Sequence, residues 1–120
     1  MDSKQMLEIA VKAGDAKRAE DIVALDVEQV SLVADYFLMM NGGSKRQVQA
    51  ITQAVLDAEG EAKVDVRRIE GKAEGTWVLL DFGDIIVHVF QEEQRQYYNL
   101  EKLWSDAPIV NVTDWLGETE

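Results

Sequence analysis

A glycine-serine turn is the first stretch of this sequence whose residue types could support chemistry. Gly42, Gly43 and Ser44 follow a predicted strand and open a predicted helix. The backbone N–H groups at such a helix start can hold a phosphate group. Lys45 and Arg46 come next and would add positive charge there. A nucleotide-binding enzyme is therefore one hypothesis for this chain.

Catalysis at this turn would require acidic side chains nearby. The turn resembles that of the nucleotidyltransferase fold, whose enzymes need a pair of carboxylates on the neighbouring strand to bridge two metal ions. The following predicted strand has Asp65 and then Arg67, so an arginine stands where the second carboxylate belongs. Asp81 and Asp84 flank a turn and would replace the pair only with special geometry. We expect no catalytic, metal-binding or cofactor-binding residues, and we interpret the glycines as a tight turn.

His88 is the single histidine of the chain, and there is no cysteine. A catalytic triad would need a nucleophile and an orienting acid around it, and a zinc site would need further nitrogen or sulfur ligands. We therefore expect a half-buried histidine satisfied by a hydrogen bond. Asp81, diagonally across a hairpin, is the candidate partner.

The predicted centre of the fold is a β-hairpin over residues 77–90. Two apolar runs flank Gly83-Asp84, a dipeptide typical of a two-residue hairpin turn. The expected cross-strand pairs are Asp81 with Ile86, Leu80 with Val87, Leu79 with His88, Val78 with Val89, and Trp77 with Phe90.

Alternation along the two strands sorts the hairpin into two surfaces. The core surface is wholly apolar and consists of Val78, Leu80, Phe82, Ile85, Val87 and Val89. The other surface, called the hairpin face below, consists of Trp77, Leu79, Asp81, Ile86, His88 and Phe90.

The hairpin face is too apolar for open water, yet it carries two polar side chains. This mixture is typical of a partner-binding face. Two other interpretations stay open. The aromatic pair of Trp77 and Phe90 could be covered by the chain's own helix, or by a second copy in a plain homodimeric structural module.

The remaining pattern predicts one α/β (α+β) domain with the order αββαβββα, built on a mixed five-stranded sheet with helices on one face. We expect Trp115 and Leu116, near the end, to fold back on the body. The expected elements outside the hairpin are a helix from Asp2 or Ser3 to Gly14, strands over 21–27 and 36–40, a helix from Ser44 to Gly60 with a capping box to Gln47, an edge strand over 64–70, and a helix from Glu92 that ends before Pro108.

Length and composition are compatible with a single soluble domain. The chain has 120 residues, a hydrophobic fraction of 47% and no cysteine, which is compatible with a reducing cytoplasm. No apolar run approaches the roughly 20 residues that cross a bilayer. The first residues match neither a signal peptide nor an organelle presequence, so we expect a cytoplasmic protein without a membrane contact.

The charge balance favours a basic partner. Twelve basic and 23 acidic side chains give a formal net charge of -11. Phosphate binding needs clustered lysine and arginine, so little direct contact with nucleic acid is expected. A basic protein surface is the better electrostatic match, although high acidity also serves solubility alone.

Many short motifs together resemble the ribosomal silencing factor family, also called RsfS, YbeB or Iojap. The resemblance covers about residues 5 to 107 and leaves the tail after Pro108 outside, so we expect a family domain over 1–107 and a tail over 108–120. The motifs are Asp21-Ile22, Leu25-Asp26-Val27, Ser31, Ala34-Asp35-Tyr36-Phe37, Gly43-Ser44, Gln47-Val48, Glu70-Gly71, residues 77–84 and 87–90, Arg95, Tyr97-Tyr98, Leu100-Glu101 and Leu103-Trp104.

The resemblance implies a nucleotidyltransferase-like fold that has lost catalysis. Members of the family bind protein fourteen of the large ribosomal subunit on the face that meets the small subunit. They thereby block subunit joining and repress translation under nutrient shortage, and free members are often homodimers.

The resemblance also assigns residues to partner contact. Trp77, Leu79 and Phe90 would be apolar anchors. Asp81, with Asp84 nearby, would pair with basic groups of the ribosomal protein. His88 would supply one directional hydrogen bond. The full set is Trp77, Leu79, Asp81, His88, Phe90 and Tyr98.

Overall fold

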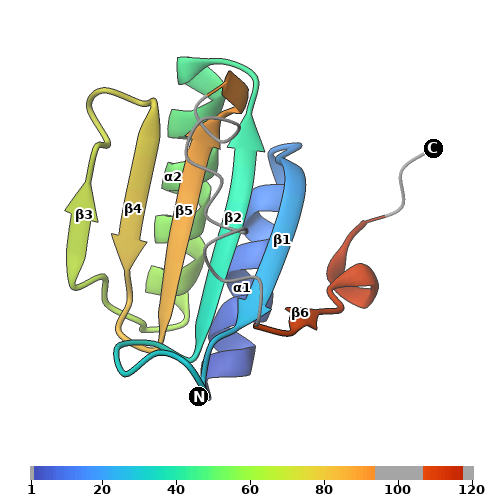
Figure 1. Cartoon of the computed structure of the whole chain (residues 1–120). Helices are drawn as coiled ribbons and strands as arrows, with labels where there is room; N and C mark the ends of the chain where they lie inside the picture. Colours follow the sequence, from blue (N-terminus) through green and yellow to red (C-terminus); the bar gives the residue numbers. More distant parts are fainter. Residues whose placement is uncertain (1, 94–106, 118–120) are drawn as a thin grey trace.

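The computed structural model describes residues 2–93 and 107–117, which form a mixed sheet with two helices behind one face (Figure 1). The six strands lie in the order β3-β4-β5-β2-β1-β6, with β2 and β5 parallel. The elements are α1 (Ser3–Ala16), β1 (Glu20–Asp26), β2 (Tyr36–Gly42), α2 (Lys45–Glu61), β3 (Arg68–Glu70), β4 (Trp77–Asp81), β5 (Ile85–Gln91), β6 (Ile109–Val110) and the 3-10 helix η1 (Thr113–Trp115).

Helix α1 begins where the sequence predicts and ends later. The Asp2 carboxylate accepts the Gln5 N–H at 2.8 Å, and the Gln5 side chain accepts the Asp2 N–H at 2.9 Å, which completes a capping box. The predicted end at Gly14 is wrong, because the helix continues to Ala16. Gly14 lets the helix pack closely against the Met40 side chain, because a Cβ at this position would overlap the Met40 sulfur.

Helix α2 has half of the predicted capping box. The Ser44 hydroxyl accepts the Gln47 N–H at 3.1 Å, as expected. The Gln47 side chain accepts the N–H of Gly43 at 2.7 Å, one residue before the position that the box requires. The helix also passes the predicted stop at Gly60 and ends at Glu61.

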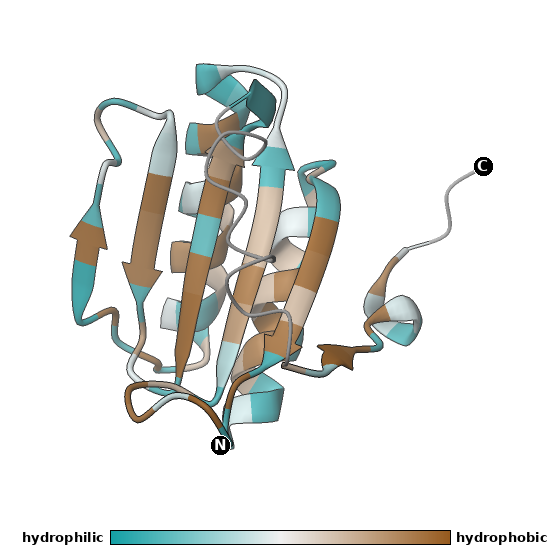
Figure 2. Ribbon diagram, viewed as in Figure 1, coloured by the Kyte–Doolittle hydropathy of each residue, from teal (hydrophilic) through white to brown (hydrophobic). Residues whose placement is uncertain are grey.

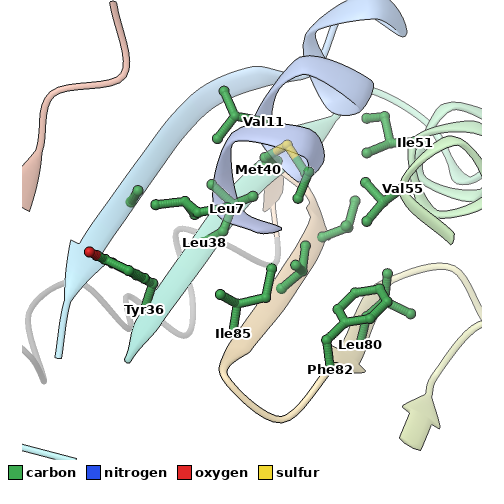
Figure 3. Close-up of a cluster of buried hydrophobic side chains, with 14 of the residues drawn as sticks. Leu7, Val11, Tyr36, Leu38, Met40, Ile51, Val55, Leu80, Phe82 and Ile85 are labelled. Atoms are coloured by element: carbon green, nitrogen blue, oxygen red, sulfur yellow. The ribbon is translucent and has the colours of Figure 1, made fainter. Parts of the chain in front are cut away.

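The main core lies between the helices and the sheet (Figure 3). Leu7 and Val11 of α1 and Ile51 and Val55 of α2 point toward the strands. The predicted core surface of the hairpin is confirmed, because all its members are buried in this cluster: Val78, Leu80, Phe82, Ile85, Val87 and Val89.

The sheet has six strands rather than the predicted five. The additional strand is β6, which pairs antiparallel with Ala24 and Leu25 of β1. Two residues are too few for alternation to be visible in a sequence. Strand β3 lies at the edge, as predicted, but contains only Arg68–Glu70, while the preceding Val64 and Val66 pack against the main core.

The last described residues return to the body of the molecule, as expected for Trp115. Val112 is buried, and Trp115 packs partly against the main core. Leu116, which was also expected to fold back, is 37% exposed. The third predicted helix lies mostly outside the described residues, and the division at residue 107 stays a prediction.

Candidate partner-binding face

The hairpin has the register that the sequence predicts, from Asp81 opposite Ile86 to Trp77 opposite Phe90. Phe82 donates its N–H to the Ile85 carbonyl at 3.0 Å and closes the turn. Gly83 has a φ of 91°, which favours glycine at this position.

The hairpin face lies on the side of the sheet away from α1 and α2. Figure 2 views the sheet from this side and shows β4 and β5 as mostly hydrophobic. Strands β1 and β2 extend the face into a second apolar cluster that includes Ile86 and Phe90. Its other buried members are Leu25, Val27, Ala34, Phe37, Met39 and Ala107.

Burial is graded across the hairpin face. Phe90 is only 1% exposed, His88 7% and Ile86 9%, so these β5 side chains are not free surface in the isolated chain. The three β4 residues Trp77, Leu79 and Asp81 are half-buried. The accessible part of the face therefore follows β4, and β5 supports it from the side.

An aromatic cluster fixes the Trp77 ring. The rings of Trp77 and Phe90 stack with centroids 5.2 Å apart and planes at 26°. His88 stacks on Phe90 at 6.0 Å, and Phe37 meets His88 edge-on at 6.0 Å. Phe37 was missed as part of this site, although alternation along the buried strand β2 places it on the same side as Met39.

The hydrogen-bond partner predicted for His88 is wrong. Trp77 Nε1–H donates to His88 Nδ1 at 3.1 Å, while the Asp81 carboxylate accepts the Gly83 N–H at 2.8 Å. Trp77 and Asp81 both lie diagonally from His88, on either side of Leu79, which is directly opposite. Because the Asp81 carboxylate is hydrogen-bonded within the turn, the Trp77 indole is the hydrogen-bond partner of His88.

His88 is neutral near pH 7. Burial lowers its pKa to about 4, because desolvation disfavours the imidazolium. Accepting the indole hydrogen bond requires an unprotonated Nδ1, so the hydrogen-bond pattern assigns the ring proton to Nε2. The histidine therefore holds Trp77 in place without contributing a charge.

A hollow opens beside Trp77. Its volume is about 260 Å³, and Glu70, Gly71, Trp77 and Leu79 line it. A Cβ on Gly71 would lie 2.1 Å from the Trp77 carbonyl oxygen, so the chain needs a glycine at this close approach. Glu70-Gly71 is one of the family motifs, but spacing along the sequence does not place it beside the indole.

Polar groups of the glycine-serine turn are hydrogen-bonded within the start of α2. Gly43 N–H is bonded to the Gln47 side chain, and Ser44 caps α2. The glycine-serine turn follows β2, and the segment that contains Asp65 leads into β3. Strands β4 and β5 separate β3 from β2, so β3 is not the strand next to the turn. Within residues 2–93 and 107–117, no group of three or more histidine, cysteine, aspartate or glutamate side chains is placed to hold a metal ion.

Two further findings concern Tyr98, a predicted partner contact, and the search for a membrane-spanning helix. Tyr98 lies outside the described residues. Among the helices that the structure describes, none combines the length and the apolar character needed to span a membrane.

Taken together, these features define an α+β domain with helices on one face of its sheet and an aromatic, partly accessible surface on the other. A family model described as "Ribosomal silencing factor during starvation" matches residues 1–120. Ribosomal silencing factor RsfS of Bacillus subtilis is 54% identical over 112 residues, which are 93% of this chain and 95% of that protein. The chain belongs to the ribosomal silencing factor family.

Two solved structures support the fold. A crystal structure of a Bacillus halodurans protein has a TM-score of 0.81 and 44% identity, covering 90% of this chain and 98% of that chain. The X-ray structure of a Chromobacterium violaceum protein has a TM-score of 0.86 and 34% identity, covering 88% of both chains.

Proposed function

We propose that this chain represses translation by binding the large ribosomal subunit and sterically blocking its joining with the small subunit. Protein fourteen of the large subunit is the proposed contact, nutrient shortage the proposed condition, and the cytoplasm the proposed location. The action requires no bond to be made or broken, no cofactor and no metal. The observation that carries the proposal, beside family membership, is the hairpin face on the side of the sheet away from α1 and α2.

The β4 side chains are the proposed direct contacts on this face. Trp77 is half-buried and held by a stacked ring and a hydrogen bond, so little side-chain freedom is lost when a partner covers it. Leu79 adds apolar surface next to the hollow. A large aromatic side chain beside a hollow is typical of an interface hot spot.

Phe90 and His88 have a supporting part in this proposal, because both are buried in the isolated chain. They orient Trp77 and do not need to meet the partner themselves. Tyr98 remains a proposed contact from the resemblance alone. Asp81 and the exposed Asp84 place negative charge at the turn, where a basic partner would find it.

The test is a subunit-joining assay with purified ribosomal subunits, combined with sedimentation of the protein with large subunits. The wild-type protein should slow joining and sediment with large subunits. Trp77→Ala should lose binding by about tenfold or more, as truncation of a hot-spot residue does, with an unchanged circular dichroism spectrum.

Trp115→Ala is the matched control, because Trp115 is also a partly buried tryptophan but packs against the main core. It should bind like the wild-type protein. Equal binding by the two variants would exclude the hairpin face as the contact. Normal joining in the presence of saturating wild-type protein would contradict the function itself.

A homodimer is the proposed state of the free protein, as the family resemblance implies. The half-buried Trp77 and Leu79 would gain cover from a second copy. Sedimentation velocity measures the state directly. A monomer throughout the micromolar range would contradict the dimer and leave the ribosomal proposal unaffected.

A further inference from the structure

The loop between β1 and β2 carries large apolar side chains that the described structure leaves in solvent. Leu32 is 106% exposed, Val33 69% and Val30 49%. This segment, residues 28–35, is called the apolar loop below. It lies at the foot of the sheet, next to the β4–β5 turn, and part of it is strongly hydrophobic in colour (Figures 1 and 2).

Hydrogen bonds fix the backbone of the apolar loop. Val27 N–H donates to the Asp35 carbonyl at 2.9 Å and closes its base. Ser31 N–H donates to the Val27 carbonyl at 2.8 Å, and Val33 N–H donates to the Ser31 hydroxyl at 3.1 Å. Asp35 N–H reaches the carbonyl of Asp84 at 2.7 Å. The outward position of the apolar side chains is therefore built into the loop and tied to the hairpin turn.

The apolar loop is continuous with the hairpin face. Val27, which directly precedes the loop, and Ala34, near its end, are buried in the same cluster as Ile86 and Phe90. These two side chains thus join the loop to that cluster. The outward ones, Val30, Leu32 and Val33, extend its apolar character to the surface at the foot of the sheet.

The surroundings of the apolar loop are acidic. Asp26, slight burial and Asp35 together raise the pKa of Glu28, with the Asp26 carboxylate as the largest cause. The pKa of Tyr36 is raised by burial and then by Glu28, Asp26, Asp35 and Asp2. No lysine or arginine occurs in residues 19–44.

This charge distribution selects the kind of partner. Two copies of the chain facing each other through this loop would bring their carboxylates together, which is unfavourable. A basic protein surface with an apolar recess satisfies both the carboxylates and the aliphatic tips. Such a surface is the occupant that the chemistry fits.

We propose that the apolar loop is a second docking element, which inserts Leu32, flanked by Val30 and Val33, into an apolar recess of a basic protein surface on the large ribosomal subunit. This inference rests on the proposed function. It adds a contact region at the foot of the sheet, separate from Trp77 and Leu79.

The experiment measures the affinity of variants for purified large subunits at fixed salt. Leu32→Ser should weaken binding by about tenfold, the loss expected for truncation of an anchor residue. Ile69→Ser is the matched control, because Ile69 is also an exposed apolar side chain, at 40%, but lies in the edge strand β3, which β4 and β5 separate from β2 and the loop. This control should bind like the wild-type protein. Glu28→Gln should lower the salt sensitivity of binding.

Folding and self-association are controlled in the same preparations. Leu32→Ser should keep the wild-type melting temperature, since its side chain contacts solvent. Val33→Ser, at a 69% exposed position, repeats the test should the first variant unfold earlier. Sedimentation velocity of each variant shows whether the loop acts between copies of the chain.

Three outcomes would overturn the inference. Wild-type binding by both loop variants, with loss of binding in Trp77→Ala, would remove the loop from the interface and keep the proposed function. Dissociation of a homodimer by Leu32→Ser, with unchanged subunit binding, would make the loop a contact between copies. No binding by the wild-type protein would overturn both the inference and the proposed function.

Discussion

At the scale of single residues, Trp77 and His88 show how one hydrogen bond can organise a surface. The indole N–H and the imidazole Nδ1 satisfy each other at 3.1 Å, and Phe90 supports both rings. The side chain proposed to meet the partner is thereby held by neighbours that are themselves buried. Pre-organisation of this kind reduces the entropy lost on binding.

Protonation of His88 should destabilise the fold. Its pKa is about 4 in the folded chain, below the ordinary value of 6.5, so the unfolded chain binds more protons between these two values. The contribution is complete above pH 6.5 and is lost as the pH falls toward 4. His88→Phe removes this titration, so the wild-type protein should lose more stability than the variant between pH 6.5 and 4.5. Urea unfolding at several pH values measures the difference.

Equal pH dependence of the two proteins in that range would mean that the His88 imidazole is solvated. A smaller pH dependence in the variant, together with weaker binding to large subunits, is the expected pair of observations. The weaker binding follows because phenylalanine cannot accept the indole hydrogen bond that orients Trp77.

Glu59 should destabilise the protein as the pH rises. Its side chain is fully buried in α2, and neither carboxylate oxygen has a hydrogen-bond partner in the described structure. Burial raises its pKa from 4.5 to about 8, so the folded chain holds a proton that the unfolded chain releases. Stability therefore falls between pH 4.5 and 8.

Glu59→Gln removes that dependence and should raise the free energy of unfolding at pH 8. About 1.4 kcal/mol for each pH unit between 4.5 and about 8 gives an upper limit of about 4–5 kcal/mol, and relaxation of the buried site reduces the expected gain to roughly 2 kcal/mol. At pH 5 the two proteins should differ little. Glu61→Gln, an exposed change on the same helix, is the control. Urea unfolding at both pH values measures it, and equal stability at pH 8 would mean that the Glu59 carboxylate is hydrated.

At the scale of elements, local signals predicted most of the fold. The hairpin was predictable in register because Gly83-Asp84 and the two apolar runs lie within one short stretch. Strand β6 was not, because its two residues gain strand geometry only from β1, far away in the sequence. The end of α1 was missed for a similar reason, since Gly14 is retained in the helix by its close approach to Met40.

The sequence predicted which side chains share the hairpin face but not how deeply each is buried, and their part in partner contact stays a prediction. Alternation placed the six side chains on one side of the hairpin. Three of them are half-buried and three are buried, and the cluster that covers Ile86 and Phe90 includes residues of β1 and β2. Phe37, which meets His88 edge-on, comes from a distant strand. Sequence spacing can assign a side chain to a face, but burial depends on which other strands complete that face.

The turn of the hairpin offers a test at this scale. Gly83 has a φ of 91°, and a Cβ there would lie 2.7 Å from the Arg67 guanidinium carbon. Gly83→Ala should therefore lower the free energy of unfolding by about 1–3 kcal/mol. Gly60 lies within α2 with nothing near its would-be Cβ, so Gly60→Ala should raise stability by about 0.5–1 kcal/mol. Denaturant unfolding compares both, and the same sign for both would contradict the backbone assignment.

At the scale of the whole molecule, the net charge governs the approach to a partner, and the shape of the surface governs the contact. The helices and the main core occupy one side of the sheet, while the hairpin face and the apolar loop occupy the other side and the foot (Figures 1 and 2). The formal net charge of -11 acts over a longer range than either surface. Attraction to a basic partner would bring the molecules together, and the apolar contacts would then hold them.

Salt should therefore slow association with the large subunit more than it speeds dissociation. The Debye length falls from about 30 Å at 0.01 M to about 10 Å at 0.1 M salt, so long-range attraction is screened while the contacts of Trp77 and Leu79 are not. Association rates from stopped-flow or surface binding should fall several-fold over this range.

Two variants with equal net charge locate the attraction. Asp84→Asn and Glu61→Gln each remove one exposed negative charge, the first at the hairpin turn and the second at the end of α2. If the turn end of the sheet approaches the basic partner, Asp84→Asn should slow association more than Glu61→Gln, because the nearer charge contributes more to the attraction. Equal rates would mean that only the overall charge matters, and faster association at higher salt would show that long-range repulsion, such as that by RNA phosphates, outweighs the attraction.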